Sequence, residues 1–323
     1  MEKNIFNKYT FYWILTVALF YLAIQGLISA NILRAYYQSI LLLIGINIIL
    51  ALGLNLIIGI TGQFSLGHAG YMAIGAYSAA ITLKYVNGIQ GLILGMLIGA
   101  LITALIAFLV GLPVLRLKGD YLAIATLGVG EIIRIIILNL DITNKAAGIN
   151  NIDRLASIPL IFGFVILAVI VTSNFKRSAL GRACISIFQD EIASEAMGIN
   201  VTRYKVMSFI FGAILASFGG ALFATTYSVV RPEFFGLNQS IDTLVIVVFG
   251  GMGSLTGTVV AAFALGIINL LLQPLGDTRM ILYAMALIAI MIFRPKGLMG
   301  SFEASWKNFK LRKPKLAHGK VNE

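Results

Sequence analysis

Long apolar segments dominate this sequence, and most of them contain no charged residue. Residues 37–60 and 89–112 are two examples, and each is longer than the ~20 residues that an α-helix needs to cross a bilayer. The segments are continuously apolar, whereas the strands of a transmembrane β-barrel alternate between apolar and polar residues. The sequence therefore predicts an all-α fold, a polytopic membrane helix bundle.

The composition excludes several other classes of protein. Charged residues make up 11% of the chain, against about 25% in a soluble domain. This is too little charge to cover a water-facing surface, which argues against a soluble enzyme. The single cysteine, Cys184, allows no internal disulfide, and we expect its side chain to be inert. No run of Cys, His, Asp and Glu has the spacing of zinc ligands, so we expect no metal site and no cofactor in this chain.

The distribution of the net charge of +11 indicates a membrane topology. The basic residues lie in short segments between the apolar runs, as juxtamembrane flanks do, and this argues against nucleic-acid binding. With a cytosolic N-terminus, the predicted inside segments carry most of the lysine and arginine, so we expect both termini in the cytosol. We expect a transmembrane domain over 1–300, with a cytosolic loop at 176–205, and a basic cytosolic tail over 301–323.

We predict about ten crossings, within a range of eight to ten. The apolar run 241–272 is too long for one straight crossing, and the glycine-rich residues 250–254 interrupt it, so we expect two short crossings or a broken helix. Small residues spaced by four, such as Gly95 and Gly99, predict close helix packing. The other predicted spans are 10–30, 37–60, 64–83, 89–112, 121–139, 158–175, 206–229 and 280–293.

Two glycine-rich clusters share the spacing Gly-x-x-Ser-Leu, and this similarity suggests an internal repeat. Clustered glycine breaks a helix, and non-helical backbone at membrane depth persists only where protein or a wet cavity satisfies it. We therefore expect both clusters to border a translocation path or its gate, with tight turns at the cytosolic surface as the alternative. The residues concerned are Gly62, Gln63, Ser65, Gly251, Gly253 and Ser254.

Polar side chains inside the predicted spans are costly, so each suggests a role. Glu131 and Arg134 share one helix face, either as a structural ion pair or as contacts for a zwitterionic substrate. Asn47 and Asn55 share another face, where interhelix hydrogen bonds are favoured over lining a path. His68 follows the first glycine cluster, where a hydrogen bond or packing is favoured over a proton relay.

The cytosolic loop 176–205 is predicted to contain one short amphipathic helix. Asp190 and Ser194 face away from its apolar side, Glu191 lies on the flank, and Gly198 ends the helix. An anionic membrane surface would repel the acidic face, so we favour docking into a groove of a partner protein over a helix lying on the headgroups. The apolar residues fall within a narrow arc at helical spacing: Ile185, Phe188, Ile192, Ala196 and Ile199.

No G-x-x-x-x-G-K-[ST] phosphate-binding loop occurs in the sequence. The chain is therefore not expected to hydrolyse ATP by that route. Energy for active transport would come from a partner or from an ion gradient.

The cytosolic loop resembles that of ABC importer permeases, and more narrowly that of the LivM-type permeases of branched-chain amino acid importers. In that family an E-A-x-G element, here Glu195-Ala196-Met197-Gly198, lies in a helix that inserts into a groove of the ATPase subunit. The loop 143–150 departs from the glycine-rich pattern of the family. Further stretches resemble the same family over residues 40–300: Gly53-Leu54-Asn55, GQFSLGHAG (62–70), GDYLA (119–123), GEIIR (130–134), FGGMGSLTG (249–257) and RPKGL (294–298).

This resemblance implies a non-enzymatic permease subunit in the bacterial cytoplasmic (inner) membrane. It implies two ABC ATPase subunits that carry ATP and Mg, a second related permease or a second copy, and an extracytoplasmic substrate-binding protein. Alternating access would move branched-chain amino acids. Related permeases for sugars, nucleosides or urea are the alternative within this class. An ion-coupled secondary transporter is the alternative outside it, with Glu131 as almost the only candidate for ion coupling.

Overall fold

The computed structural model describes residues 25–26, 35–272, 285, 288 and 297–300, and Ala35–Ser301 form one compact unit. The expected all-α architecture is confirmed, since the strands in the described part are the two-residue antiparallel pair β1 (Ile149–Asn150) and β2 (Val229–Val230). The α-helices are α2 (Ala35–Asn55), α3 (His68–Leu83), α4 (Gly88–Val114), α5 (Asp120–Asn139), α6 (Ile158–Arg177), α7 (Ala179–Gln189), α8 (Glu191–Ala196), α9 (Val201–Tyr227), α10 (Leu237–Gly250) and α11 (Leu255–Leu272).

Short irregular elements complete the unit. A π-helical turn, Leu56–Ile60, continues α2, and two 3-10 helices, Lys145–Ala147 and Pro232–Phe235, lie in the connections. The predicted spans 10–30 and 280–293, and the tail 301–323, lie outside the described residues.

Six of the described helices are long and apolar enough to cross a membrane: α2 with its π-helical turn, α4, α5, α6, α9 and α11. α3, with 16 residues, and α10, with 14 residues, are shorter than a full span. The predicted interruption of the run 241–272 is confirmed, because α10 ends at Gly250 and α11 begins at Leu255. Two predicted boundaries were wrong: α3 begins at His68 rather than 64, and α9 begins at Val201 rather than 206. The total of about ten crossings stays a prediction.

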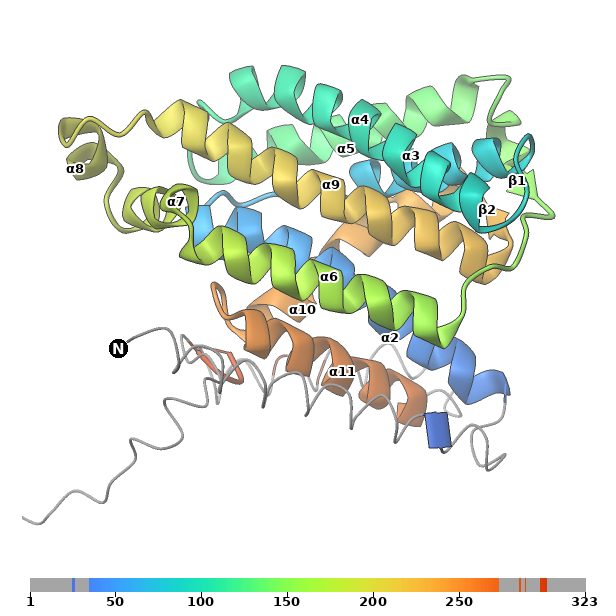
Figure 1. The fold of residues 1–323 in the computed structure, drawn as a ribbon. Coiled ribbons are helices and arrows are strands. Elements are labelled where there is room, and N and C mark those ends of the chain that lie inside the picture. Colours follow the sequence, from blue (N-terminus) through green and yellow to red (C-terminus); the bar gives the residue numbers. More distant parts are fainter. Residues whose placement is uncertain (1–24, 27–34, 273–284, 286–287, 289–296, 301–323) are drawn as a thin grey trace, which may run out of the picture. The chain divides into compact units, whose positions relative to one another are not determined.

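Close backbone contacts between small residues hold α2, α3, α4 and α9 together (Figure 1). A Cβ atom on Gly53 of α2 would approach the carbonyl oxygen of Gly212 on α9 to 2.7 Å. A Cβ on Gly95 of α4 would approach the Cα of Ala79 on α3 to 2.6 Å. These contacts confirm that the small residues spaced by four serve helix packing, since only glycine lets the backbones approach so closely.

The connections gather at two opposite ends of the helices. At one end, Lys118 lies 3.8 Å from Glu191, and Lys176 donates to the carbonyl of Gly253, so the predicted inside segments meet there. At the other end, the two short strands pair, and Ile152 N donates to the carbonyl of Ser228. The segments predicted to share a side of the membrane therefore share an end of the fold. We call the first the inner end and the second the outer end.

Candidate functional site

The first glycine cluster forms a non-helical segment that runs into the depth of the bundle. Gln63 lies near the inner end, where its Nε2 donates to the carbonyl of Lys205 at 3.1 Å. His68 Nε2 lies 3.0 Å from the carbonyl oxygen of Leu50. At about 1.5 Å per residue, Leu50 lies about 15 Å before the end of the π-helical turn at Ile60. Residues 62–67 thus climb from the inner end to about the middle of the membrane before α3 begins, as a segment bordering an internal path would.

The second glycine cluster is a tight turn at the inner end. Ser254 N donates to the carbonyl of Gly251 at 3.1 Å, and Gly251 and Gly253 have φ values of 106° and 83°. Only glycine adopts such angles without strain. Ser254 Oγ then accepts from Gly257 N at 3.0 Å and caps the first turn of α11.

The fully buried side chain of Asn55 joins the two clusters. Its Oδ1 accepts from Gly253 N at 2.8 Å, and its Nδ2 donates to Ser254 O at 3.1 Å and to Thr258 Oγ1 at 2.9 Å. A Cβ on Gly59 would overlap both Asn55 Oδ1 and the Gly253 backbone. The interhelix hydrogen bonding expected of Asn55 is therefore found. It connects two helix breaks that are far apart in the sequence.

Asn47 does not share this role. Its side chain makes no hydrogen bond with any residue that the structure describes.

The π-helical turn that follows Asn55 is supported by α9, because Ser208 Oγ donates to the carbonyl of Leu56 at 2.9 Å. Single π-helical turns inside α-helices are rare and are frequently found at functional sites.

The loop 176–205 differs from the single amphipathic helix that we expected. Asp190 has an extended backbone (φ −157°, ψ 111°) and separates α7 from α8. Its Oδ1 accepts from Ala193 N at 3.0 Å, so it caps the second helix. The prediction was wrong because an aspartate competes with its own helix for backbone N–H groups and favours a cap over a helix interior. Ser194, expected on the solvent side, is buried.

Because the break at Asp190 divides the loop into two helices, the side chains of the loop lie on other faces than a single helix would give them. Gly181, Cys184 and Ile187 form the buried side of α7, so the expected apolar arc does not stay on one face. Phe188, Ile192 and Met197 are instead exposed by 46%, 78% and 83%. Together they place an apolar surface on either side of the break.

The acidic residues of the loop also have different surroundings. Glu191 Oε2 accepts from the largely buried Lys205 Nζ at 2.9 Å. Glu195 is exposed, and its carboxylate has no hydrogen bond or ion pair with any residue in the described ranges. Ala196 and Gly198 are exposed beside it. Glu195 is thus the acid of this loop that is free to meet a partner.

The loop contacts both glycine clusters. A Cβ on Gly62 (φ 71°) would overlap the ring of Phe188. Lys176 Nζ, in the last turn of α6, donates to the carbonyl of Gly253 at 2.5 Å. The loop therefore lies in direct contact with the backbone of both breaks. Sequence reasoning missed Lys176, Lys205 and Thr258, because no local pattern reveals their distant partners.

The predicted pair of Glu131 and Arg134 is formed on α5. Glu131 Oε2 lies 2.7 Å from both Nε and Nη2 of Arg134, and the two side chains are 32% and 28% exposed. At about 1.5 Å per residue, Glu131 lies about 16 Å from the start of α5 at Asp120, near the middle of the membrane. The structural ion pair, one of two alternatives for these residues, is therefore present.

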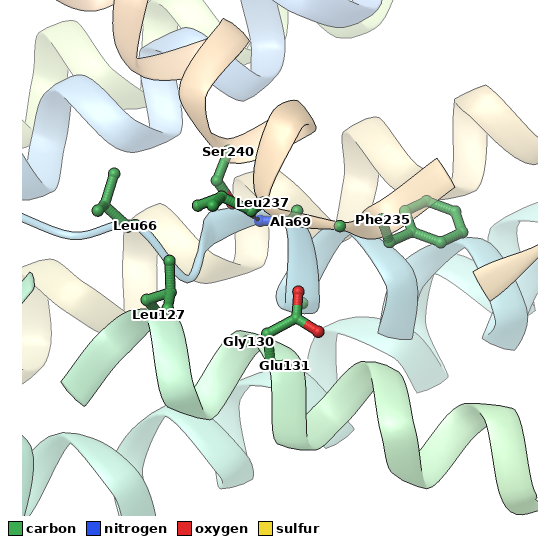
Figure 2. Close-up of a pocket in the computed structure, with 10 residues that line it drawn as sticks. Leu66, Ala69, Leu127, Gly130, Glu131, Phe235, Leu237 and Ser240 are labelled. Atoms are coloured by element: carbon green, nitrogen blue, oxygen red, sulfur yellow. Dashed lines mark hydrogen bonds between the residues drawn. The ribbon is translucent and has the colours of Figure 1, made fainter. Parts of the chain in front are cut away.

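Glu131 also lines a small cleft, and Figure 2 shows its carboxylate pointing from α5 toward the first turn of α3. Ala69 N at the start of α3 donates to Ser240 Oγ near the start of α10 at 3.1 Å. The two short helices therefore both begin beside this cleft, at mid-depth. Its volume of about 10 Å³ holds no more than a water molecule.

The first break packs against α5 at the same level. Leu66 N donates to Thr126 Oγ1 at 3.1 Å, and a Cβ on Gly67 would overlap the carbonyl of Thr126. Ser65 is buried between these contacts and those of Gln63. The end of the first break thus lies against α5, and Leu66 lines the same cleft as Glu131.

Cys184 is buried on α7, and its Sγ lies 3.7 Å from the carbonyl of Tyr204. Burial raises the pKa of this thiol to about 12, because the thiolate would lose its hydration. The residue has the surroundings of an inert thiol. Among the described residues, no three His, Cys, Asp or Glu side chains are grouped to hold a metal ion.

Comparison with known proteins places the chain among transport proteins. Residues 36–293 match the family described as "Branched-chain amino acid transport system / permease component". The high-affinity branched-chain amino acid transport system permease protein LivM of Salmonella typhimurium is 36% identical over 268 residues, 71% of this chain and 62% of that protein. The permease protein LivH of Escherichia coli is 30% identical over 138 residues, 42% of this chain and 44% of that protein.

The chain thus spans 62% of the length of the LivM protein that it matches. A probable LivM permease of the archaeon Methanocaldococcus jannaschii is 24% identical over 223 residues. No solved structure matches the chain significantly. Because the family match covers residues 36–293, which is most of the sequence, this chain belongs to the family of branched-chain amino acid transport system permease components.

Proposed function

We propose that this multi-pass membrane protein is the translocating permease subunit of a binding-protein-dependent ABC importer for branched-chain amino acids. Two partner ATPase subunits bind ATP and Mg at the inner end, and a binding protein delivers substrate at the outer end. A second permease, related or identical, completes the complex. The inner end faces the bacterial cytosol, in agreement with its excess of lysine and arginine.

One observation carries this proposal: the loop 176–205 exposes apolar side chains beside a free carboxylate, and it also contacts both glycine breaks. Phe188, Ile192 and Met197 are exposed apolar side chains next to the free carboxylate of Glu195. An apolar patch with a charged rim is typical of a protein interface rather than of a membrane surface. Motion of the ATPases would reach the helix bundle through the Lys176–Gly253 hydrogen bond.

Alternating access fits the narrow cleft beside Glu131. A cleft of about 10 Å³ holds no amino acid, so no substrate fits beside Glu131 in this conformation. Passage of a substrate requires the breaks at 62–67 and 251–254 to move, and a two-state rearrangement of this kind is what ATP-driven partners impose. Large apolar side chains need few intramembrane charges for their passage, in agreement with the single ion pair described on α5.

The decisive experiment reconstitutes the chain in liposomes with the second permease, the ATPases and the binding protein. ATP-dependent leucine accumulation is expected, and Glu195→Arg should abolish copurification of the ATPase. Glu233→Arg provides a matched control, because Glu233 is exposed at the outer end and the same charge reversal there should leave ATPase binding unchanged. Uphill accumulation by the chain without an ATPase would refute the proposal and support ion coupling through Glu131.

A further inference from the structure

A pocket of about 240 Å³ lies at the outer end of the fold, where α9 ends, and we call it the outer pocket. A cavity of ~150 Å³ is enough to bind benzene, so this volume suits a molecule the size of an amino acid. The cleft beside Glu131, in contrast, holds no more than a water molecule. Among the described residues, the outer pocket is lined by Ser39, Arg154, Thr226, Tyr227 and Ser228.

Backbone hydrogen bonds fix the position of the arginine in this pocket. Ile152 N, two residues before Arg154, donates to the carbonyl of Ser228 at 3.1 Å, and the strands β1 and β2 pair beside this bond. The guanidinium reaches α2, where its Nη2 donates to Ser39 Oγ at 3.4 Å. Residues from α2, from the segment before α6 and from the end of α9 therefore meet at one site.

Among the described residues, the lining of the outer pocket carries one positive charge and no negative charge. Arg154 forms no ion pair with any carboxylate that the structure describes, including that of the neighbouring Asp153. The hydroxyls of Tyr227 and Ser228 make no hydrogen bond with a described residue, so they are free to donate. The planar fork of a guanidinium matches a carboxylate or a phosphate, and free hydroxyls beside it strengthen the preference for such an anion.

The aromatic wall of the outer pocket favours a small carboxylate that also carries an apolar group. The side chain of Tyr227 is 49% exposed, and its ring packs on that of Phe223 with 4.6 Å between the centroids. The ring thus offers apolar surface close to the guanidinium. An amino acid with an apolar side chain presents both features in a molecule of this size, and this is the class of substrate proposed for the permease.

The backbone at Ser228 gives a second, independent argument. The residue ends α9 in the left-handed conformation (φ 59°, ψ 9°), a position at which glycine is the usual residue. A residue with a Cβ atom is strained there, whereas glycine is not. Residues held in such conformations cluster at catalytic and ligand-binding sites. At this position, the strained residue keeps a hydroxyl in the wall of the outer pocket.

We propose that the outer pocket receives the amino acid that the binding protein releases, with Arg154 holding its carboxylate. The inference rests on the proposed function and adds an entry site to it. The Ser228 hydroxyl donates to the same carboxylate, and the apolar side chain of the substrate lies against the ring of Tyr227. The pocket then holds the substrate at the outer end until the breaks at 62–67 and 251–254 move.

Protection of a cysteine tests this proposal in the complete complex, held in phosphatidylcholine nanodiscs without the binding protein. Ser228→Cys is made in a Cys184→Ser background, where it is the only cysteine of this chain. Leucine and isocaproate, which both carry the carboxylate, should slow its reaction with N-ethylmaleimide, and leucinamide, which lacks the carboxylate, should not. The control Glu233→Cys, exposed at the same end outside the pocket, should react equally fast with and without leucine.

The role of the arginine is tested in the same Ser228→Cys chain. Arg154→Gln should raise the leucine concentration that gives half-maximal protection about tenfold or more, since it removes charge-assisted hydrogen bonds to the carboxylate. Arg154→Lys keeps the charge without the planar fork and should give an intermediate value. Arg231→Gln is the matched control, because Arg231 is exposed at the same end and does not line the pocket. Equal concentrations with arginine and with glutamine at position 154 would refute the role of Arg154.

Other results would overturn the entry site. Protection by phosphatidylglycerol nanodiscs without any amino acid would assign the pocket to a lipid phosphate. Protection by the leucine-free binding protein, but not by leucine, would make it a docking surface. Absence of protection by leucine, in a complex that accumulates leucine with ATP, would refute the site and leave the proposed function intact. Failure of ATP-dependent uptake would instead contradict the proposed function, and the entry site with it.

Discussion

Gly253 donates its backbone N–H to the side-chain oxygen of Asn55 at 2.8 Å, across 198 residues of sequence. The same asparagine donates to Ser254 and Thr258, so one buried side chain holds the end of α2 against the turn between α10 and α11. Lys176 donates to the carbonyl of Gly253 at the inner end. The turn is thus held by a helix of the core and by α6, the helix that leads into the loop 176–205.

Removing the Asn55 side-chain amide should destabilise the protein. Asn55→Leu removes the acceptor of the Gly253 N–H, and leaving such a backbone donor without a partner costs about 1–3 kcal/mol. We expect a lower Tm in detergent. Asn47→Leu is the control, because it makes the same change on the same helix without removing a described hydrogen bond. Equal Tm values for the two variants would contradict the role of Asn55.

Lys176→Met should uncouple ATP hydrolysis from transport. The substitution removes a charge-assisted hydrogen bond to the second break, which contributes about 1.5–3 kcal/mol to the state that contains it. Uptake is therefore expected to fall about tenfold or more, while binding of the ATPase and its basal activity persist. Arg177→Met, at the exposed neighbouring residue, should leave uptake unchanged. A parallel loss of ATPase binding in Lys176→Met would instead indicate a role in docking.

The Glu131–Arg134 pair is suited to a double-mutant cycle. Glu131→Gln leaves the arginine unpaired at mid-depth, and Glu131→Gln with Arg134→Gln removes both charges. For a structural pair, the coupling energy from thermal unfolding should be about 0.5–3 kcal/mol, and the double variant should regain uptake. Loss of uptake in the double variant, with stability restored, would show instead that the charges contact the zwitterionic substrate.

Cys184 should resist alkylation over a wide pH range. Burial raises its pKa to about 12, so at pH 9 about 0.1% of the thiol is ionised, against about half of an exposed thiol. We expect labelling by iodoacetamide to be several hundredfold slower than at an exposed reference, Met197→Cys in a Cys184→Ser background. The rates are measured by mass spectrometry between pH 7 and 10. Fast labelling of Cys184 would mean that α7 separates from α9.

Much of the architecture was predictable because it depends on local properties of the chain. Apolar length identified the helices, and clustered glycine identified the breaks at 62–67 and 251–254. The Glu131–Arg134 pair was predictable because both residues belong to one turn of one helix. The break at Asp190 could also have been predicted from the sequence. Aspartate is a preferred residue at the start of a helix, where its carboxylate accepts from the backbone N–H three residues later.

What the chain alone determined is its membrane class, its helices and the places where they stop, because each follows from the period and composition of a short stretch of sequence. Only the tertiary structure decided that Asn55 meets Gly253, that Lys176 reaches the same glycine, and that residues 62–67 climb to mid-depth. These contacts depend on which faces of distant helices pack together. Almost every face here is apolar, and hydropathy does not distinguish a core face from a lipid face when the surrounding solvent is itself hydrocarbon.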